Sequence, residues 1–196
     1  VINFWDWPQK RAQEYQLPWE WIEERVKPDR FRVRDDGRYV CAEPLRDEWW
    51  LYEGRRVGLF HAIGRGQHFE RHPDGWSPKN SPAKKVMVCS EVTKHLSYVL
   101  IRNDCIMSDR ADVFRKEESF AICQSALHEV WARAYSSRLE TRLKYSIGNA
   151  FETFPFPAHP HSDVLKRGEH LHQLRAALMV KDGIGLTKLY NRFHTD

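Results

Sequence analysis

The chain has 196 residues, of which 41% are hydrophobic and 30% are charged. This length and hydrophobic content support one sizeable globular domain, or one domain with appendages. A mean hydropathy of −0.67 and the lack of any run of about 20 uncharged apolar residues argue against membrane insertion. The net charge of +4 is basic but moderate, so the distribution of charge matters more than its total.

The number and spacing of the cysteines indicate the redox state of the cellular compartment. The four cysteines are widely spaced and form no CxxC pair, which suggests neither a zinc site nor a disulfide framework. A reducing compartment is then the default, and we expect a cytoplasmic protein.

Residues 1–45 alternate tryptophans, prolines and charges, and only the stretch 19–26 looks helical, with Pro18 suited to a first turn. We therefore expect an extended lead-in that tethers this chain to another part of a protein. The chain starts VINFWDW, without an initiator methionine or a leader pattern, and we interpret it as a fragment of something longer.

The middle of the chain combines a short helix, a polar loop and strands. A sparse apolar pattern at Val57, Phe60 and Ile63 predicts one or two helical turns before Gly64. The following residues, 64–85, are rich in Gly, Pro, Ser and Asn and read as a loop. The β-branched stretches 86–92 and 97–101, with turn residues at 102–105, predict a small antiparallel sheet.

Two helices are expected further on. The first starts at Ser119 as N-cap, and its apolar positions fall at steps of three and four residues: Phe120, Cys123, Leu127, Val130, Trp131 and Ala134. The second runs from Ser162 until Gly183 stops it. The expected fold class is α+β, with a small antiparallel or mixed sheet packed against a few helices, an extended N-terminal lead-in and a C-terminal helix.

An unusual apolar segment, FETFPFP, occupies residues 151–157. Each proline removes an amide donor and favours extended geometry in the residue before it. We expect an extended strap that lies across the helix starting at Ser119, with Phe154 and Phe156 closing the core rather than contacting a partner.

Signatures of catalysis are missing from the sequence. It contains no GxSxG, HExxH or Walker pattern, and we assign it no catalytic, cofactor-binding or metal-binding residue. The pairs His159/His161 and His170/His172 lack supporting Cys or carboxylate clusters. A nuclease site is hinted at only by Glu91 and Lys94, which lack an upstream aspartate on a partnering strand.

Cations interleaved with aromatic residues favour nucleic-acid binding, because each contacted phosphate needs one positive charge. The expected phosphate contacts are Lys84, Lys85, Lys94, Arg102, Arg110, Arg133, Arg138, Arg142 and Lys144. Weaker candidates for base contacts lie in loops: Arg65, Gln67, Asn80 and Asn103. The alternative is a protein-interaction or scaffold domain whose basic residues form an ordinary solvated surface.

A family resemblance is carried by residues 120–157, which read FAICQSALHEVWARAYSSRLETRLKYSIGNAFETFPFP. This run resembles the C-terminal part of the target-recognition domain, with a TaqI-like specificity fold, of large restriction-modification or phage-defence DNA adenine methyltransferases. Its most specific pieces are residues 128–131, 136–137, 144–146 and 151–157. The flanks 1–15 and 183–194 are similar to the segments around that domain.

The resemblance implies a division of labour. Residues 46–157 would be the DNA target-recognition domain, residues 1–45 the lead-in from an absent N-terminal methyltransferase domain, and residues 158–196 a C-terminal helical extension. The chain itself would hold no cofactor and perform no catalysis. The parent would be a site-specific adenine-N6 methyltransferase that uses S-adenosylmethionine, with or without restriction endonuclease activity, and its partner would be double-stranded DNA.

Overall fold

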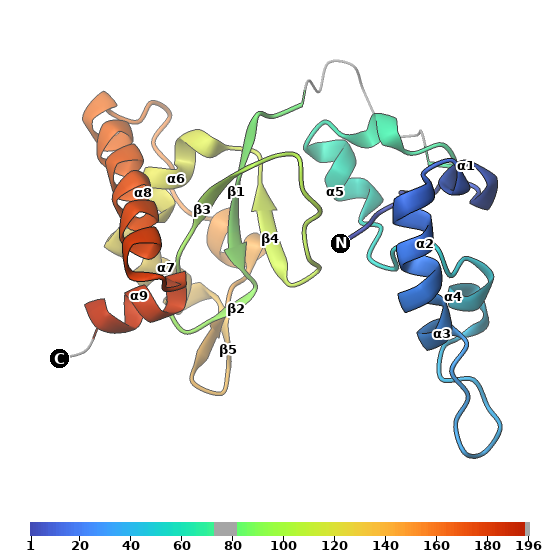
Figure 1. Cartoon of the computed structure of the whole chain (residues 1–196). Coiled ribbons are helices and arrows are strands. Elements are labelled where there is room, and N and C mark those ends of the chain that lie inside the picture. Colours follow the sequence, from blue (N-terminus) through green and yellow to red (C-terminus); the bar gives the residue numbers. More distant parts are fainter. Residues whose placement is uncertain (73–81, 195–196) are drawn as a thin grey trace. The chain divides into compact units, whose positions relative to one another are not determined.

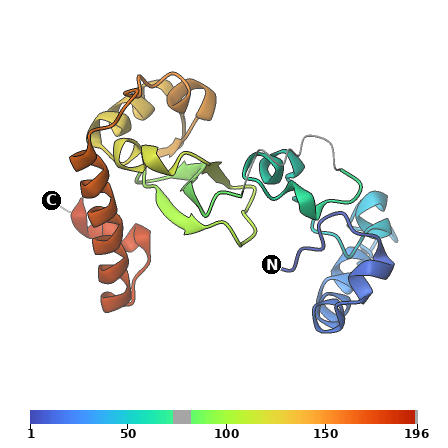
Figure 2. The same ribbon diagram turned by 90° about the horizontal axis from the view of Figure 1, so that it is seen from above.

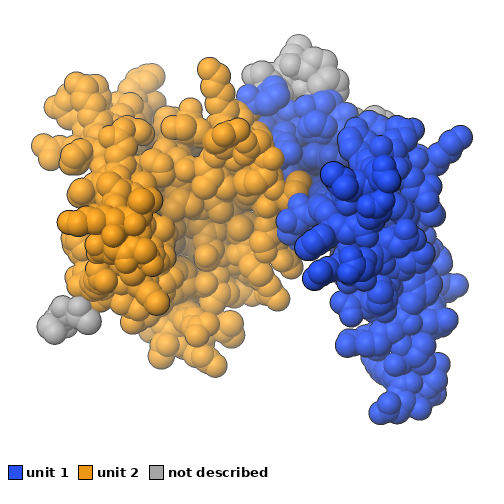
Figure 3. Space-filling view, viewed as in Figure 1, with its two compact units in different colours: residues 1–82 blue, residues 83–196 orange. Residues whose placement is uncertain are grey.

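The computed structural model describes residues 1–72 and 82–194. The chain forms two compact units, Val1–Pro82 and Ala83–Asp196, which are coloured separately in Figure 3. Within the described ranges, no helix combines the length and the apolar character needed to cross a membrane.

Unit 1 is built from short helices joined by loops (Figure 1). Its elements are α1 (Gln9–Gln13), α2 (Gln16–Arg25), α3 (Lys27–Arg30), α4 (Glu43–Asp47), α5 (Val57–Ala62) and the 3-10 turn η1 (Gly66–His68). The helix predicted at 19–26 is confirmed as α2, which begins three residues earlier, and the turns predicted before Gly64 are confirmed as α5. Gly64 ends this region with φ 80°, a conformation that glycine adopts without strain.

The expectation of an extended lead-in at residues 1–45 is wrong in its local structure. This segment contains α1, α2, α3 and the start of α4, and Trp5, Trp7 and Trp19 are buried in an aromatic core instead of lying along a tether. Trp19 packs on Trp49 with ring centroids 5.0 Å apart, and Trp5 packs edge-on against Phe60 at 4.9 Å. Large rings bury so much apolar surface that they stabilise short helices with little intrinsic propensity.

A buried carboxylate closes unit 1. Asp6 is fully buried and accepts hydrogen bonds from the backbone amides of Glu70 and Arg71, at 2.7 and 2.8 Å. Its other neighbours are the His72 Nδ1 at 2.8 Å and the Arg71 Nε, which donates to the Asp6 carbonyl. The N-terminal segment and residues 70–72 are thereby held together over more than sixty positions of sequence.

Unit 2 contains two antiparallel three-stranded sheets, so the α+β prediction is confirmed. Its described strands are β1 (Lys85–Ser90), β2 (Val92–Thr93), β3 (Val99–Arg102), β4 (Ala111–Phe114), β5 (Ser137–Leu139) and β6 (Arg142–Lys144). The sheet orders are β3-β1-β4 and β2-β6-β5. The predicted strand 86–92 therefore ends at Ser90, and the chain passes to the second sheet at Val92. The predicted pairing of the first two strands is confirmed, with Met87 opposite Leu100.

Six helical elements complete the described part of unit 2. They are η2 (Glu117–Ser119), α6 (Phe120–Cys123), α7 (Ala126–Tyr135), the π-helical turn η3 (Ile147–Phe151), α8 (Ser162–Asp182) and α9 (Leu186–Phe193). The prediction of one continuous helix from Ser119 is wrong. The chain breaks after Cys123, and the Ser125 hydroxyl caps a new helix by accepting from the His128 amide.

The break also changes the buried face of the second helix. Leu127 and Val130, which the period placed in the core, are 70% and 68% exposed. His128 and Ala132 point inward instead, and both are fully buried. Because a new helix begins after Ser125, its inward-facing positions are not in register with those of α6. A single period of 3.6 residues, continued from α6, therefore predicts the wrong buried positions in α7.

The core of unit 2 encloses a polar trio. The Nε2 of His128 lies 3.1 Å from the Tyr98 hydroxyl and 3.0 Å from the Tyr145 hydroxyl. Burial lowers the pKa of His128 to about 4 and raises the pKa of both tyrosines far above their usual range. The histidine is therefore neutral at physiological pH, and the trio joins α7 to the residue before β3 and the residue after β6.

The aromatic strap at residues 151–157 packs on α7, as predicted. Phe154 is 7% exposed, and its ring lies 4.7 Å from that of His128 and 5.7 Å from that of Trp131. Phe156 is half-buried and packs against Phe154 at 4.9 Å. The phenylalanines of the strap are thus part of the scaffold of unit 2.

Helix α8 lies beside α6 (Figures 1 and 2) and is fixed by one buried cation. Arg175 is 5% exposed and donates to the Tyr98 carbonyl at 2.6 Å, to the Gln124 Oε1 at 3.0 Å and to the Tyr190 hydroxyl at 2.9 Å. At Gly168 the helix approaches so closely that a Cβ would lie 2.5 Å from that of Ala121. The helix ends at Gly183, as predicted, with φ 58°.

Candidate DNA interface

The hairpin formed by β5 and β6 is exposed at every residue from Ser137 to Arg142. Leu139 pairs with Arg142, which leaves a two-residue turn of Glu140 and Thr141. Glu140 has φ 56°, a left-handed conformation that costs a non-glycine residue free energy. On β6, Leu143 is only 2% exposed and anchors the hairpin in the core. The turn is therefore presented to solvent on a fixed base.

Six of the predicted phosphate contacts gather around this hairpin. Arg138 lies on β5 and Arg142 and Lys144 on β6, and all three are exposed. Strand β2 pairs with β6, so Lys94, which follows β2, lies at the same sheet. We call the group the hairpin cluster; its members are Lys94, Arg110, Arg133, Arg138, Arg142 and Lys144.

Arg133 and Arg110 join the hairpin cluster through contacts outside the hairpin. The Arg133 guanidinium reaches the Lys94 carbonyl at 3.5 Å. The Glu91 carboxylate lies 3.9 Å from Arg110 and 3.7 Å from Lys144, so one acid links both cations.

Acidic partners neutralise part of the hairpin cluster. Glu91 lies near Arg110 and Lys144, and Glu129 binds Arg133 at 2.6 Å. Within the described residues, Arg138 and Arg142 form no ion pair. Among the arginines of the hairpin cluster, these two consequently have the greatest free capacity for phosphate.

The remaining predicted phosphate contacts lie at the other end of β1. Lys85 begins that strand and is opposite Arg102 at the end of β3, and Lys84 directly precedes it. All three are exposed, and Arg102 forms an ion pair with Asp104. A strand of six residues spans about 20 Å, so the structure divides the predicted cations into two groups instead of one patch.

The predicted base contacts are divided between the two units. Asn103 makes structural hydrogen bonds: its side-chain Nδ2 donates to the Ala83 carbonyl at 3.0 Å, and its backbone amide donates to the Lys84 carbonyl at 3.1 Å. In unit 1, Gln67 is exposed on η1, whereas the Arg65 guanidinium lies 5.1 Å from the Trp5 ring centroid. Asn80 lies outside the described residues.

A catalytic or metal centre is not evident in the part of the chain that the structure describes. Groups of three or more His, Cys, Asp or Glu side chains that could hold a metal ion do not occur there. Burial raises the pKa of Cys89 above its usual range and that of Cys123 to about 12, so neither thiol is an activated nucleophile.

Sequence reasoning found the cations of the hairpin but not the hairpin itself. The turn residues Glu140 and Thr141 offer no Gly, Asn or Asp, which are the residues that normally announce a two-residue turn. The available signal was weaker: Leu143 alternates with Arg142 and Lys144, as in a half-buried strand. Leu139, 54% exposed next to the turn, was not singled out either.

An exposed cationic hairpin fixed on a small α+β core is the arrangement of a nucleic-acid-binding module. Residues 68–158, a little under half of the chain, match the family model of the MmeI target recognition domain. The match identifies this part of the chain as a restriction-modification specificity domain, as the resemblance of residues 120–157 predicted, and a domain of this kind implies DNA binding. Neither a curated protein nor a solved structure matches the chain.

Proposed function

We propose that this chain is the double-stranded DNA recognition module of a cytoplasmic, S-adenosylmethionine-dependent adenine-N6 methyltransferase, or of a fused restriction-modification enzyme. Catalysis and cofactor binding would then lie in a methyltransferase domain outside this chain, and residues 1–45 would lead from that domain. A TaqI-like character of the specificity domain belongs to the same proposal. Support comes from the match to a target recognition domain at residues 68–158.

The observation that carries the proposal is the presence of two unpaired arginines, Arg138 and Arg142, on an anchored hairpin. A two-stranded β-ribbon fits the major groove of B-DNA, where base edges can be told apart. Phosphate contacts by the flanking cations would fix the register of such a ribbon. The burial of Leu143 would keep the hairpin in one orientation, which base readout requires.

Salt titration of DNA binding tests the proposal. Fluorescence anisotropy with a labelled duplex should give a linear fall of log affinity with log salt, with a slope of about −0.9 per phosphate neutralised. The double variant Arg138→Gln/Arg142→Gln should lower the magnitude of that slope by about 1.8.

The matched control removes the same charge from the exposed surface of α8, as Lys166→Gln/Arg167→Gln. It should bind like the parent. A parent chain that binds no duplex at low salt would favour the scaffold alternative. A control that lost as much slope as the hairpin variant would show only non-specific attraction by net charge.

A further inference from the structure

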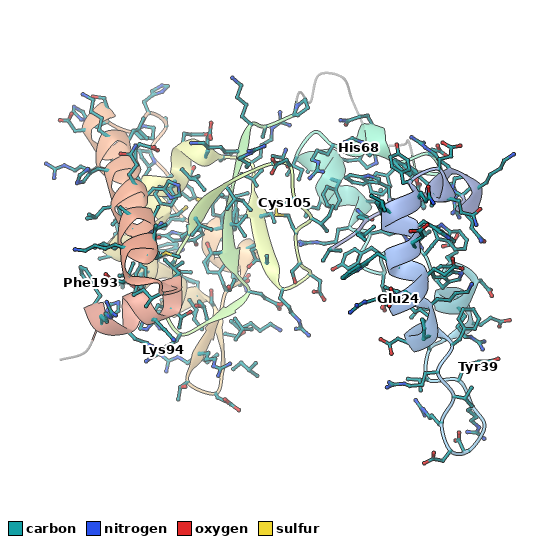
Figure 4. The ribbon with its side chains drawn as sticks, in the orientation of Figure 1. Glu24, Tyr39, His68, Lys94, Cys105 and Phe193 are labelled. Atoms are coloured by element: carbon teal, nitrogen blue, oxygen red, sulfur yellow. The ribbon has the colours of Figure 1, made fainter. Side chains whose placement is uncertain are left out.

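Unit 1 contains a second cationic hairpin, which the family match at residues 68–158 does not include. Residues 31–41 leave the end of α3 and return to α4 as an antiparallel ribbon, visible as the blue loop in Figure 1. Tyr39 marks it in Figure 4. Val33 and Tyr39 form its bridge, and the Arg34 amide donates to the Arg38 carbonyl at 2.8 Å. We call residues 31–41 the arginine hairpin.

The register of the arginine hairpin separates two kinds of side chain. With Val33 opposite Tyr39, Arg34 is opposite Arg38 and Arg32 is opposite Val40. Directly opposite residues share a face and successive residues alternate, so all three arginines lie on one face. The other face carries the exposed apolar residues Phe31, Val33 and Tyr39.

The arginine face carries three cations, and the nearest acids in sequence, Asp35 and Asp36, lie in the turn. Arg32, Arg34 and Arg38 are exposed, and across the described ranges none of them forms an ion pair. Asp36 lies in the turn, but its carboxylate accepts from the Arg38 backbone amide. Like charges directly opposite each other on a ribbon destabilise it, and a polyanion would relieve the repulsion of Arg34 and Arg38.

The arginine hairpin is held in place at its base. Arg30, the last residue of α3, forms an ion pair with Glu53 at 3.3 Å. The Arg46 guanidinium of α4 lies 3.8 Å from the centroid of the Tyr39 ring, within range of a cation–π contact. The turn is fixed by Gly37, whose φ of 78° is left-handed and whose amide donates to the Arg34 carbonyl.

We infer that the arginine face of residues 31–41 is a second contact for double-stranded DNA, made to the phosphate backbone without regard to sequence. Guanidinium groups match phosphate oxygens in geometry as well as charge, which favours this partner. The inference rests on the proposed function, since a module that reads DNA brings the duplex to this chain. It assigns a role in affinity to a part of unit 1 outside the matched recognition domain, most of which lies in unit 2.

The test compares three triple variants of the full chain by anisotropy with two duplexes of unrelated sequence. Arg32→Gln/Arg34→Gln/Arg38→Gln should reduce the magnitude of the salt slope by about 2.7 on both duplexes alike. The corresponding lysine variant keeps the charge and should retain the slope. The control Lys166→Gln/Arg167→Gln/Lys181→Gln removes three exposed charges from α8 and should behave like the parent.

Failures of the two proposals differ in outcome. If the parent and the control bind DNA but the glutamine variant keeps the full slope, the arginine face meets no DNA, and the inference falls while the proposed function stands. If the parent binds no duplex, both fall. Loss of slope on only one duplex would contradict a sequence-independent contact. Circular dichroism of each variant checks that the helices of both units remain folded.

Discussion

The hairpin of β5 and β6 and the arginine hairpin of unit 1 carry similar charges on very different supports. The first belongs to a three-stranded sheet and is anchored by a buried leucine, Leu143. The second has a single bridge and is held by an ion pair and a cation–π contact at its base. Base readout needs fixed side chains, whereas phosphate attraction tolerates motion. The difference in support suggests a difference in task.

The largest effect should come from removing the strap that supports α7. Phe154→Ala leaves a cavity beside His128 and should lower the free energy of unfolding of unit 2 by about 3 to 5 kcal/mol. Urea unfolding followed by circular dichroism measures it, and Phe193→Ala, at a side chain 82% exposed, is the control. A variant that unfolds like the parent yet loses DNA would make the strap a recognition element.

A slightly smaller effect should follow at the anchor of the β5–β6 hairpin. Leu143→Ala should cost about 2 to 5 kcal/mol and accelerate hydrogen exchange in β6. Leu139→Ala, on the same hairpin but exposed, should change the free energy of unfolding by less than about 0.5 kcal/mol. Equal effects of the two changes would contradict the idea that the core fixes this hairpin.

Acid should weaken the core of unit 2, which supports the β5–β6 hairpin. The pKa of His128 is about 4 in the folded chain against 6.5 when unfolded, so between these values only the unfolded state gains the proton. Stability from this group is complete above pH 6.5 and falls by about 2 to 3 kcal/mol as the pH drops to 4. Residues 31–41 contain no histidine, so no group of this kind titrates within the arginine hairpin itself.

Urea unfolding at several pH values measures the acid effect. His128→Gln should flatten the dependence between pH 6.5 and 4. An undiminished pH dependence in that variant would show that other groups cause the loss.

The smallest effects should lie in the two turns, and with opposite signs. Gly37→Ala places a Cβ in a left-handed conformation and should cost about 1 to 2 kcal/mol locally, whereas Glu140→Gly should relieve strain of that kind. Hydrogen exchange should quicken about tenfold at the Arg34 amide in the first variant and slow at the Arg142 amide in the second. Exchange that quickens in both would refute the strain at Glu140.

Local signals explain which elements were predictable. Gly183 correctly predicted the end of α8, and β-branched residues correctly predicted β1 and β3. Ser125 was overlooked as a cap because Ser119 already satisfied the rule for one helix start. The helices of residues 1–45 lack a clear period, and their stability comes from tertiary contacts such as Trp19 on Trp49.

The interface was predictable in composition but not in arrangement. The Asp36–Gly37 pair between alternating residues is a strong hairpin signal, and it was overlooked in a segment that looked like a tether. The partners of the cations could not be read from sequence, since Glu91 and Lys144 are brought together only by the pairing of β2 with β6. Whether the predicted contacts touch phosphates or bases stays a prediction.

Arg175 determines which residues must be exchanged together if the recognition domain is moved from one chain into another. The family match ends at residue 158, yet the guanidinium that satisfies the Tyr98 carbonyl and the Gln124 side chain comes from α8. In a chimera that exchanged only residues 68–158 between two related chains, a helix from the other chain would have to supply these hydrogen bonds, and a buried carbonyl left without a partner is destabilising. An exchanged segment therefore has to include α8, which carries Arg175, and α9, which carries its partner Tyr190.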